Sequence, residues 1–193
     1  TLMQKKNKIT KLLESKCSQC GSCCCDPLIE LTHFDIRRLV DHTGISADRL
    51  VKLYSSSDMD GEEEQEWIRL SYGKRMIGLS KKRNGSCMFL SREKSCTAYE
   101  ARPMSCRLFP INVEFEEDEK TCNMELSDII KDKFINCKRS SGKARPYKEF
   151  FAVATNAMKE YEEYSSRIEK WNSSSERGGK QELLEYLVSS KRE

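Results

Sequence analysis

Four cysteines within eight positions, Cys17, Cys20, Cys23 and Cys24, are the feature that most constrains how this chain can fold. They form the pattern C-x2-C-G-x-C-C. The two-residue gap lets two thiolates reach one metal or one cluster without backbone strain, and Gly21 allows a tight turn that brings amide N–H groups toward sulfur. Four thiols this close together have no packing reason to cluster, so the block predicts a metal site.

A second group of cysteines follows far downstream. Adjacent side chains usually diverge, so Cys23 and Cys24 are expected to serve different centres or to bridge two metals in one. Four upstream and four downstream thiols would make two sites of four ligands. The predicted ligands are Cys17, Cys20, Cys23, Cys24, Cys87, Cys96, Cys106 and Cys137. Cys122 is the alternative to Cys137 as the last ligand. For Cys25 and Cys122 the competing interpretation is a small buried hydrophobic residue.

The cysteine spacing leaves the metal open between iron and zinc. Three closely spaced cysteines with a distant fourth hold four-iron clusters in ferredoxin-type loops, and two of the spacings also suit zinc. Basic residues lie beside the cysteines in sequence, where they would offset and tune a thiolate centre or simply be solvated surface charges. These residues are Lys16, Arg92, Lys94, Arg102, Arg107, Lys138 and Arg139.

Composition narrows the class of protein. Of the 193 residues, 37% are hydrophobic and 34% are charged, which predicts a small apolar core. A bound metal would add to the stability of such a fold. The net charge of +3 is too small to indicate nucleic-acid binding, which needs a strong basic excess on one face. The charged segment 1–16 lacks a signal-peptide core and no run reaches a membrane span, so we expect a cytoplasmic protein without membrane association. Thiols stay reduced there, which favours metal over disulfides.

Local patterns predict mostly helices. The expected helices span 1–15, 32–44, 46–54, 124–136, 147–171 and 181–190. Thr32 and Asp35 form a capping box for the second of these, Gly44 ends it, and His33 is expected to be exposed in its first turn. The expected strands are a hairpin over 67–79 that turns at Gly73-Lys74, a short buried strand over 87–90, and 111–115. No internal repeat is evident.

These elements predict an α+β fold, a mostly helical single domain with a small irregular antiparallel sheet and cysteine loops stapled by metal. The predicted division is a cysteine-cluster metal-binding domain over 1–145 and a C-terminal helical extension over 146–193 that packs on it. A flexible link is expected near 172–180, where Ser, Asn and Gly are frequent.

The combined cysteine pattern resembles the YkgJ-type cysteine-cluster family, described as zinc- or iron-chelating. The first signature is 17–24, the second is Cys87-Met88-Phe89-Leu90 with 96–110, and the capped helix at 31–39 fits between them. The resemblance covers about residues 17 to 142. Two departures are Cys25, which makes a triple cysteine where the family has a pair, and Ala98, which stands where a larger aliphatic residue is usual.

Within the second signature, Arg102-Pro103 has its own physical interpretation. Pro103 fixes the backbone, and the planar fork of Arg102 can hold a carboxylate or a carbonyl. Tyr99 and Glu100 are expected on one short turn with it. Arg102 would then organise the cluster loop through a buried ion pair, with substrate binding as the alternative.

Three functions remain open. The first is an iron–sulfur protein, with two four-iron clusters as one arrangement, that acts in electron transfer or as an accessory factor to another protein. The second, implied by the family's flagellin lysine methylase group, is a protein lysine N-methyltransferase-like enzyme. The chain shows no Gly-rich strand–helix turn suited to S-adenosylmethionine and no obvious general base near the cysteines. The third is a structural zinc-binding module.

Overall fold

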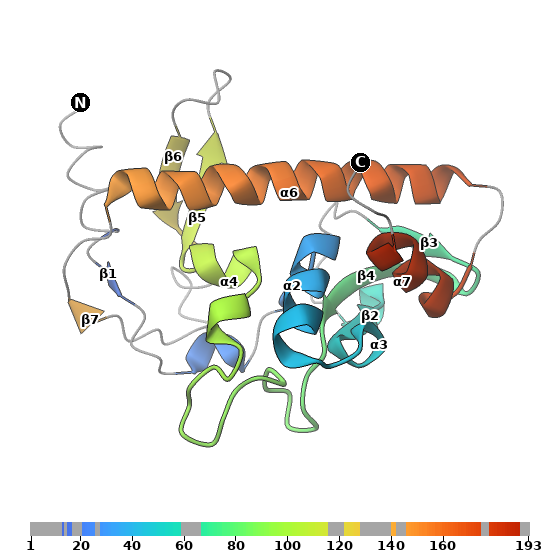
Figure 1. Ribbon diagram of the computed structural model, residues 1–193, viewed down its shortest axis with the longest axis horizontal. Helices are drawn as coiled ribbons and strands as arrows, with labels where there is room; N and C mark the ends of the chain where they lie inside the picture. The colour runs from blue at the N-terminus through green and yellow to red at the C-terminus, as the bar shows by residue number, and fades with distance from the viewer. Residues whose placement is uncertain are drawn as a thin grey trace. The chain divides into compact units, whose positions relative to one another are not determined.

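The computed structural model describes residues 13, 15–16, 21–25, 28–58, 67–115, 122–127, 140–141, 146–174 and 178–189. Figure 1 shows the elements in these ranges. The helices are α2 (His33–Thr43), α3 (Ala47–Leu50), α4 (Met104–Leu108), α6 (Tyr147–Ser173) and α7 (Lys180–Ser189). The strands are β1 (Ser15–Lys16), β2 (Val51–Tyr54), β3 (Ile68–Leu70), β4 (Gly73–Leu79), β5 (Ile111–Phe115), β6 (Cys122–Leu126) and β7 (Ser140–Ser141). Helices beside small antiparallel sheets confirm the α+β class.

The chain divides into two compact units, each assembled from segments distant in sequence. The first unit comprises Thr1–Pro27, Phe89–Thr97 and Met104–Ala157, and the second comprises Leu28–Met88, Ala98–Pro103 and Met158–Glu193. Helix α6 therefore contributes its beginning to the first unit and the rest to the second. The division into 1–145 and 146–193 stays a prediction.

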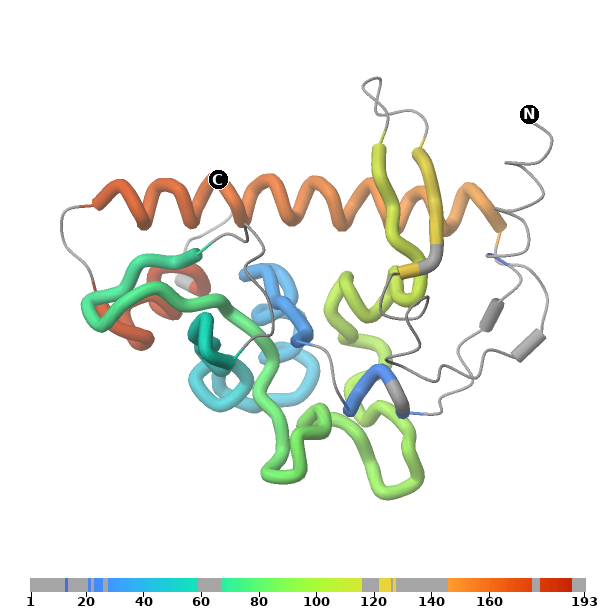
Figure 2. The backbone as a smooth tube through the Cα atoms, turned by 180° about the vertical axis from the view of Figure 1, so that it is seen from behind, coloured from blue at the N-terminus to red at the C-terminus, as the bar shows by residue number. Residues whose placement is uncertain are grey.

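The first unit has its apolar core between a hairpin and the start of α6. Strands β5 and β6 pair antiparallel, with Ile111 opposite Leu126 and Phe115 opposite Cys122. Phe150 and Ala154 of α6 share one core cluster with residues of this hairpin. Figure 2 shows the hairpin beside the beginning of α6. The core residues are Leu13, Ile111, Cys122, Met124, Phe150 and Ala154. Alternation in β5 turns every second side chain toward the helix.

The second unit is built on a three-stranded antiparallel sheet in the order β2-β4-β3. The predicted hairpin over 67–79 is confirmed, but its predicted turn at Gly73-Lys74 is wrong. Leu70 pairs with Gly73, so the turn lies at Ser71-Tyr72. At the end of α6, Asn172 accepts a hydrogen bond from the Arg69 amide at 2.8 Å and donates to the Trp67 carbonyl at 2.9 Å. One side chain thereby satisfies backbone groups of edge strand β3.

Helix α2 is the best-predicted element. Thr32 accepts a hydrogen bond from the Asp35 amide at 3.2 Å, and Asp35 accepts one from the Thr32 amide at 3.0 Å. Gly44, with φ of 67°, ends the helix and its amide donates to the Val40 carbonyl at 2.8 Å. The capping box and the glycine stop are therefore confirmed.

Three predicted elements differ from the structure. The helix over 46–54 is wrong beyond Leu50, because Val51–Tyr54 pairs with Met76–Leu79 of β4 as a strand. The strand over 87–90 is wrong, because isolated bridges replace it. The helix over 124–136 is wrong at its start, where Met124 belongs to β6, and its remainder from 128 lies outside the described residues.

The long helix over 147–171 is confirmed and extends to Ser173. The last helix is confirmed over Lys180–Ser189. Most of the predicted helix over 1–15 and part of the predicted link at 172–180 lie outside the described residues.

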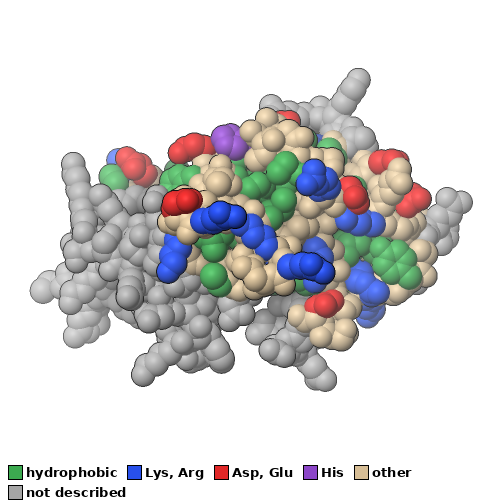
Figure 3. All heavy atoms as spheres, turned by 90° about the horizontal axis from the view of Figure 1, so that it is seen from below, with side chains coloured by type: hydrophobic (Ala, Val, Ile, Leu, Met, Phe, Trp, Pro, Cys, Tyr) green, Lys and Arg blue, Asp and Glu red, His purple; other side chains and the backbone are tan. Residues whose placement is uncertain are grey.

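On the face that Figure 3 draws, lysine and arginine side chains lie among apolar, neutral and acidic ones. Of the helices that the structure describes, none combines the length and apolar character needed to cross a membrane.

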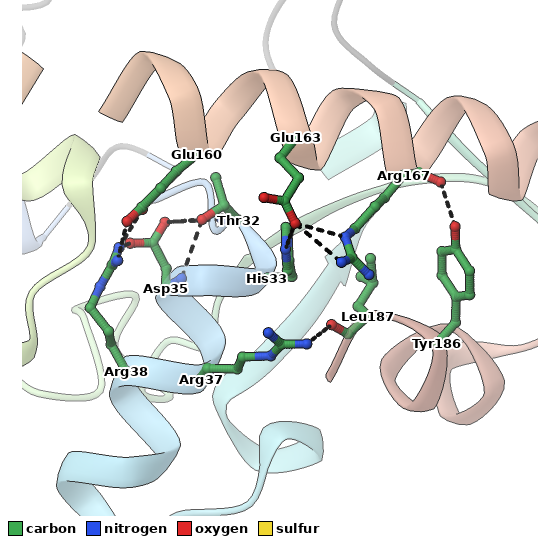
Figure 4. A network of polar contacts seen from close by, with 10 residues as sticks. All are labelled: Thr32, His33, Asp35, Arg37, Arg38, Glu160, Glu163, Arg167, Tyr186 and Leu187. Atoms are coloured by element: carbon green, nitrogen blue, oxygen red, sulfur yellow. Dashed lines mark hydrogen bonds and ion pairs between the residues drawn. The ribbon is translucent and has the colours of Figure 1, made fainter. Parts of the chain in front are cut away.

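Buried polar residues join α2 to α6 within the second unit, as Figure 4 shows. Arg38 donates to both carboxylate oxygens of Glu160 and to Asp35, whose other oxygen accepts from the Thr32 hydroxyl at 2.9 Å. Asp35 and Glu160 are buried. The guanidinium group of Arg38 binds both carboxylates and neutralises part of their negative charge. This interaction offsets the free energy that their burial costs.

The expectation that His33 is exposed is wrong. Its side chain is fully buried, its ring stacks on Tyr164, and Nε2 lies 3.3 Å from a carboxylate oxygen of Glu163. Arg167 donates to the same oxygen at 3.1 Å. The second part of α6 covers the first turn of α2, a contact between segments 130 positions apart that local sequence does not encode.

Candidate metal centre

The N-terminal cysteine block turns at Gly21. Gly21 has φ of +73°, and a 3-10 turn follows it over Ser22–Cys24. Its carbonyl accepts hydrogen bonds from the Cys24 amide at 3.0 Å and from the Cys25 thiol at 3.3 Å. Cys25 is exposed, so the interpretation of Cys25 as a buried residue is wrong. The left-handed conformation explains why glycine follows the first C-x2-C pair.

Cys23 and Cys24 are consecutive residues of this 3-10 turn, and both are partly buried. Successive side chains on a 3-10 helix are rotated by about 120°. The two thiols therefore project in different directions. This geometry supports the expectation that they do not share one mononuclear metal.

Gly21 also lies against the second cysteine segment within the first unit. A β-carbon at Gly21 would stand 3.1 Å from Cδ1 of Leu90 and 3.5 Å from Cβ of Lys94. Leu90 pairs through an isolated bridge with Cys96. Two cysteine segments that are about 70 positions apart in sequence are thus packed together, and glycine is required at the contact.

Two consecutive loops with the same backbone geometry present Cys87 and Cys96. Lys81 bridges to Cys87, and Leu90 bridges to Cys96. Inside the loops, the amide of Lys82 donates to the Ser86 carbonyl at 2.7 Å, and that of Ser91 to the Ser95 carbonyl at 2.8 Å. The loops form successive bends in the green part of the tube in Figure 2. The structure therefore contains a nine-residue repeat, although the two loops share only an arginine, Arg83 and Arg92, and the Ser-Cys pair that ends each of them.

Matching left-handed residues complete this repeat. Gly85 has φ of 82° and its amide donates to the Lys82 carbonyl at 2.9 Å. Lys94, at the equivalent position, has φ of 61° and its amide donates to the Ser91 carbonyl at 3.2 Å. Each loop thus reverses the chain sharply and ends on a cysteine, buried in the case of Cys87 and partly buried for Cys96.

Cys106 is partly buried on the short helix α4, which begins directly after Pro103. Arg102 precedes it at the end of a 3-10 turn over Tyr99–Ala101. The Nε of Arg102 donates to the Tyr99 carbonyl at 2.9 Å, and its guanidinium lies 3.5 Å from the centre of the Tyr99 ring. The prediction that Arg102 holds a carbonyl is confirmed, and its ion pair and substrate roles stay predictions.

Cys122 occupies a different environment. Its side chain belongs to the apolar core of the first unit, and its sulfur lies 3.8 Å from the Tyr147 hydroxyl. Burial raises the pKa of the Cys122 thiol, which favours the protonated form over the thiolate that a metal needs. The interpretation of Cys122 as a buried core residue is confirmed.

The predicted ligand set stays a prediction. Cys17, Cys20 and Cys137 lie outside the described residues, and the residues that are described contain no group of three or more Cys, His, Asp or Glu side chains able to hold a metal ion. The chemistry of the donors nevertheless fits zinc or iron. They are sulfur atoms, which suit these metals and do not suit calcium or magnesium.

Charge near the downstream cysteines supports the same chemistry. Seven basic and two acidic residues lie between 81 and 107, whereas the whole chain has a net charge of only +3. The basic residues are Lys81, Lys82, Arg83, Arg92, Lys94, Arg102 and Arg107. Positive charges in such a segment can offset the negative charge of metal-bound thiolates.

The chain belongs to the CxxCxxCC family, whose description reads "Putative zinc- or iron-chelating domain"; the family model matches residues 16–123. This match confirms the resemblance found from the cysteine signatures. It includes seven of the eight predicted ligands and leaves Cys137 beyond its end.

The chain is also similar to an uncharacterized protein of the archaeon Methanocaldococcus jannaschii. The two are 29% identical over 111 residues, which is 57% of this chain and 52% of the relative. The chain thus spans about half the length of that relative. No solved structure matches the chain significantly.

Proposed function

We propose that this protein holds iron as an iron–sulfur centre between its two cysteine segments, and that it acts in electron transfer or as an accessory factor to another protein. The observation that supports it most is the close approach of Gly21 to Leu90, which brings the turn that carries Cys23 and Cys24 to the loop that ends on Cys96. A bound centre of this kind supplies one-electron chemistry.

The geometry of the thiols favours a multinuclear centre. Cys23 and Cys24 diverge on their 3-10 turn, so each would ligate a different metal atom. The eight predicted ligands match two four-iron clusters, each with four cysteines. The chain's own residues would fix the positions of the thiolates through the turn at Gly21 and the two loops, and the basic residues between 81 and 107 would offset their negative charge.

A structural zinc site is the second candidate function, because small sheets need a further source of stability. The described strands form sheets of only two or three members, which are marginal without further support. A zinc ion held by four thiolates would supply that support and would make folding depend on metal.

Anaerobic purification with measurement of iron, zinc and acid-labile sulfide, together with a visible spectrum, tests the proposal. We expect iron and sulfide in similar amounts and charge-transfer absorption in the visible. A colourless protein that contains zinc and no sulfide would overturn the iron–sulfur proposal in favour of the zinc module.

A further inference from the structure

Lys94 adopts a left-handed backbone conformation, which glycine could adopt at a lower energy. Among the described residues other than glycine, it alone has a positive φ, at 61°. The equivalent position of the preceding loop is Gly85, where φ is 82° and a β-carbon would meet nothing within 4 Å. The left-handed region disfavours residues with a β-carbon, so Lys94 bears a backbone cost that Gly85 avoids.

The side chain of Lys94 lies where the two cysteine segments meet. Its Cβ is 3.5 Å from the β-carbon position of Gly21, the residue between Cys20 and the 3-10 turn that contains Cys23 and Cys24. Lys94 is also two positions before Cys96. The residue is exposed, so its ammonium group keeps its hydration while the first carbon of its stem lies beside the glycine turn.

We propose that Lys94 is a positioning residue of the metal centre. Its stem supports the Gly21 turn, and its ammonium group offsets the negative charge that metal-bound thiolates bring to this place. Metal held by four thiolates carries net negative charge, and a nearby cation stabilises such a centre relative to free thiols and metal. This inference rests on the proposed function, because it concerns the same centre.

The test compares variants of the anaerobically purified protein by the rate at which iron or zinc passes to an excess of the chelator EDTA. Lys94→Gln removes the positive charge and keeps most of the aliphatic stem, whereas Lys94→Arg keeps both. Lys94→Gly removes the side chain and the cost of its left-handed backbone conformation. Lys74→Gln is the matched control, because it removes the charge of an exposed lysine outside the basic segment 81–107. Urea unfolding of each variant separates metal retention from stability.

We expect Lys94→Gln to release metal about two- to fivefold faster than wild type, as an exposed charge at this range permits. Lys94→Arg should release it at the wild-type rate. Lys94→Gly should release metal faster although its fold is at least as stable, a combination that a purely structural role does not produce. The difference should shrink at high salt.

Two results would overturn the inference while leaving the proposed function intact. One is equal metal release by wild type and Lys94→Gln. The other is equal acceleration in Lys94→Gln and Lys74→Gln, which would indicate an effect of general surface charge. A wild-type protein that holds neither iron nor zinc would overturn both the inference and the proposed function.

Discussion

Arg38 and Glu160 form a two-pronged ion pair between residues 122 positions apart. Nη1 and Nη2 of Arg38 donate to the two carboxylate oxygens of Glu160 at 2.5 and 2.8 Å. Nη2 also donates to buried Asp35, so one guanidinium satisfies two carboxylates. The pair fixes the first turns of α2 against the second part of α6.

Replacing this arginine should be costly because it leaves two buried carboxylates without their cation. We expect Arg38→Ala to lower the free energy of unfolding by about 2–4 kcal/mol, measured by urea denaturation. Arg49→Ala, at an exposed arginine of α3, serves as the control and should change it by less than about 0.5 kcal/mol. Similar losses in the two variants would show that the ion pair does not hold α2 to α6.

His33 makes stability depend on pH. Burial, and next the nearby charge of Arg167, lower the pKa of His33 from 6.5 to about 4, and Glu163 only partly opposes them. The unfolded chain therefore binds more protons than the folded chain between pH 4 and 6.5. Stability from this residue is fully present above pH 6.5 and is lost as the pH falls toward 4.

The expected size is about 2 kcal/mol between pH 7 and pH 5. Urea denaturation at several pH values checks it, with His33→Gln as the comparison. The variant should be less stable at pH 7, but its free energy of unfolding should fall less steeply between pH 7 and pH 5. Parallel pH profiles of variant and wild type would contradict the expectation.

Elements whose signals are local could be predicted from the sequence. Thr32, Asp35 and Gly44 lie within or next to the helix that they define, so α2 was predicted with its correct ends. Elements decided by distant partners could not. The segment Val51–Tyr54 continues a helical pattern, but pairing with β4 makes it a strand.

The same distinction applies to the candidate site. The cysteine signatures predicted the family, because spacing in sequence is what the family pattern records. The loop repeat was missed because the loops share their backbone geometry but few residues beyond the Ser-Cys pair. The approach of Gly21 to Leu90 was missed because the two residues are distant in sequence. The burial of His33 was missed because the residues that cover it come from α6.

Gly21 offers a test of the contact between the two cysteine segments. Gly21→Ala places a β-carbon in the left-handed region and 3.1 Å from Leu90. Gly85→Ala meets the same backbone penalty, about 1–2 kcal/mol, with open space around the new carbon. We expect Gly21→Ala to cost more stability than Gly85→Ala in urea denaturation and to lose metal in elemental analysis.

Leu90→Val in the Gly21→Ala background should restore part of the loss, because the shorter side chain leaves room for the methyl group. Equal effects of Gly21→Ala and Gly85→Ala would mean that only backbone conformation matters at Gly21. The packing of the N-terminal block on the second segment would then not contribute to the metal site.

Cys106 is a predicted metal ligand and Cys122 is a core residue, so replacing each of them should have a different effect. Cys106 lies partly buried on α4 within the second family signature, whereas Cys122 packs in the apolar core with its thiol pKa raised by burial. We expect Cys106→Ala to lose bound metal. Cys122→Ala should retain it and lose about 1–2 kcal/mol of stability from the smaller core side chain.

Metal content per chain, measured on anaerobically purified variants alongside urea denaturation, distinguishes the two. The paired design matters because both changes remove one thiol and leave alanine, so a general effect of thiol loss would act on both. Unchanged metal content in Cys106→Ala would remove Cys106 from the ligand set. Loss of metal in Cys122→Ala, with its fold retained, would place Cys122 in that set and reverse the interpretation drawn from its burial.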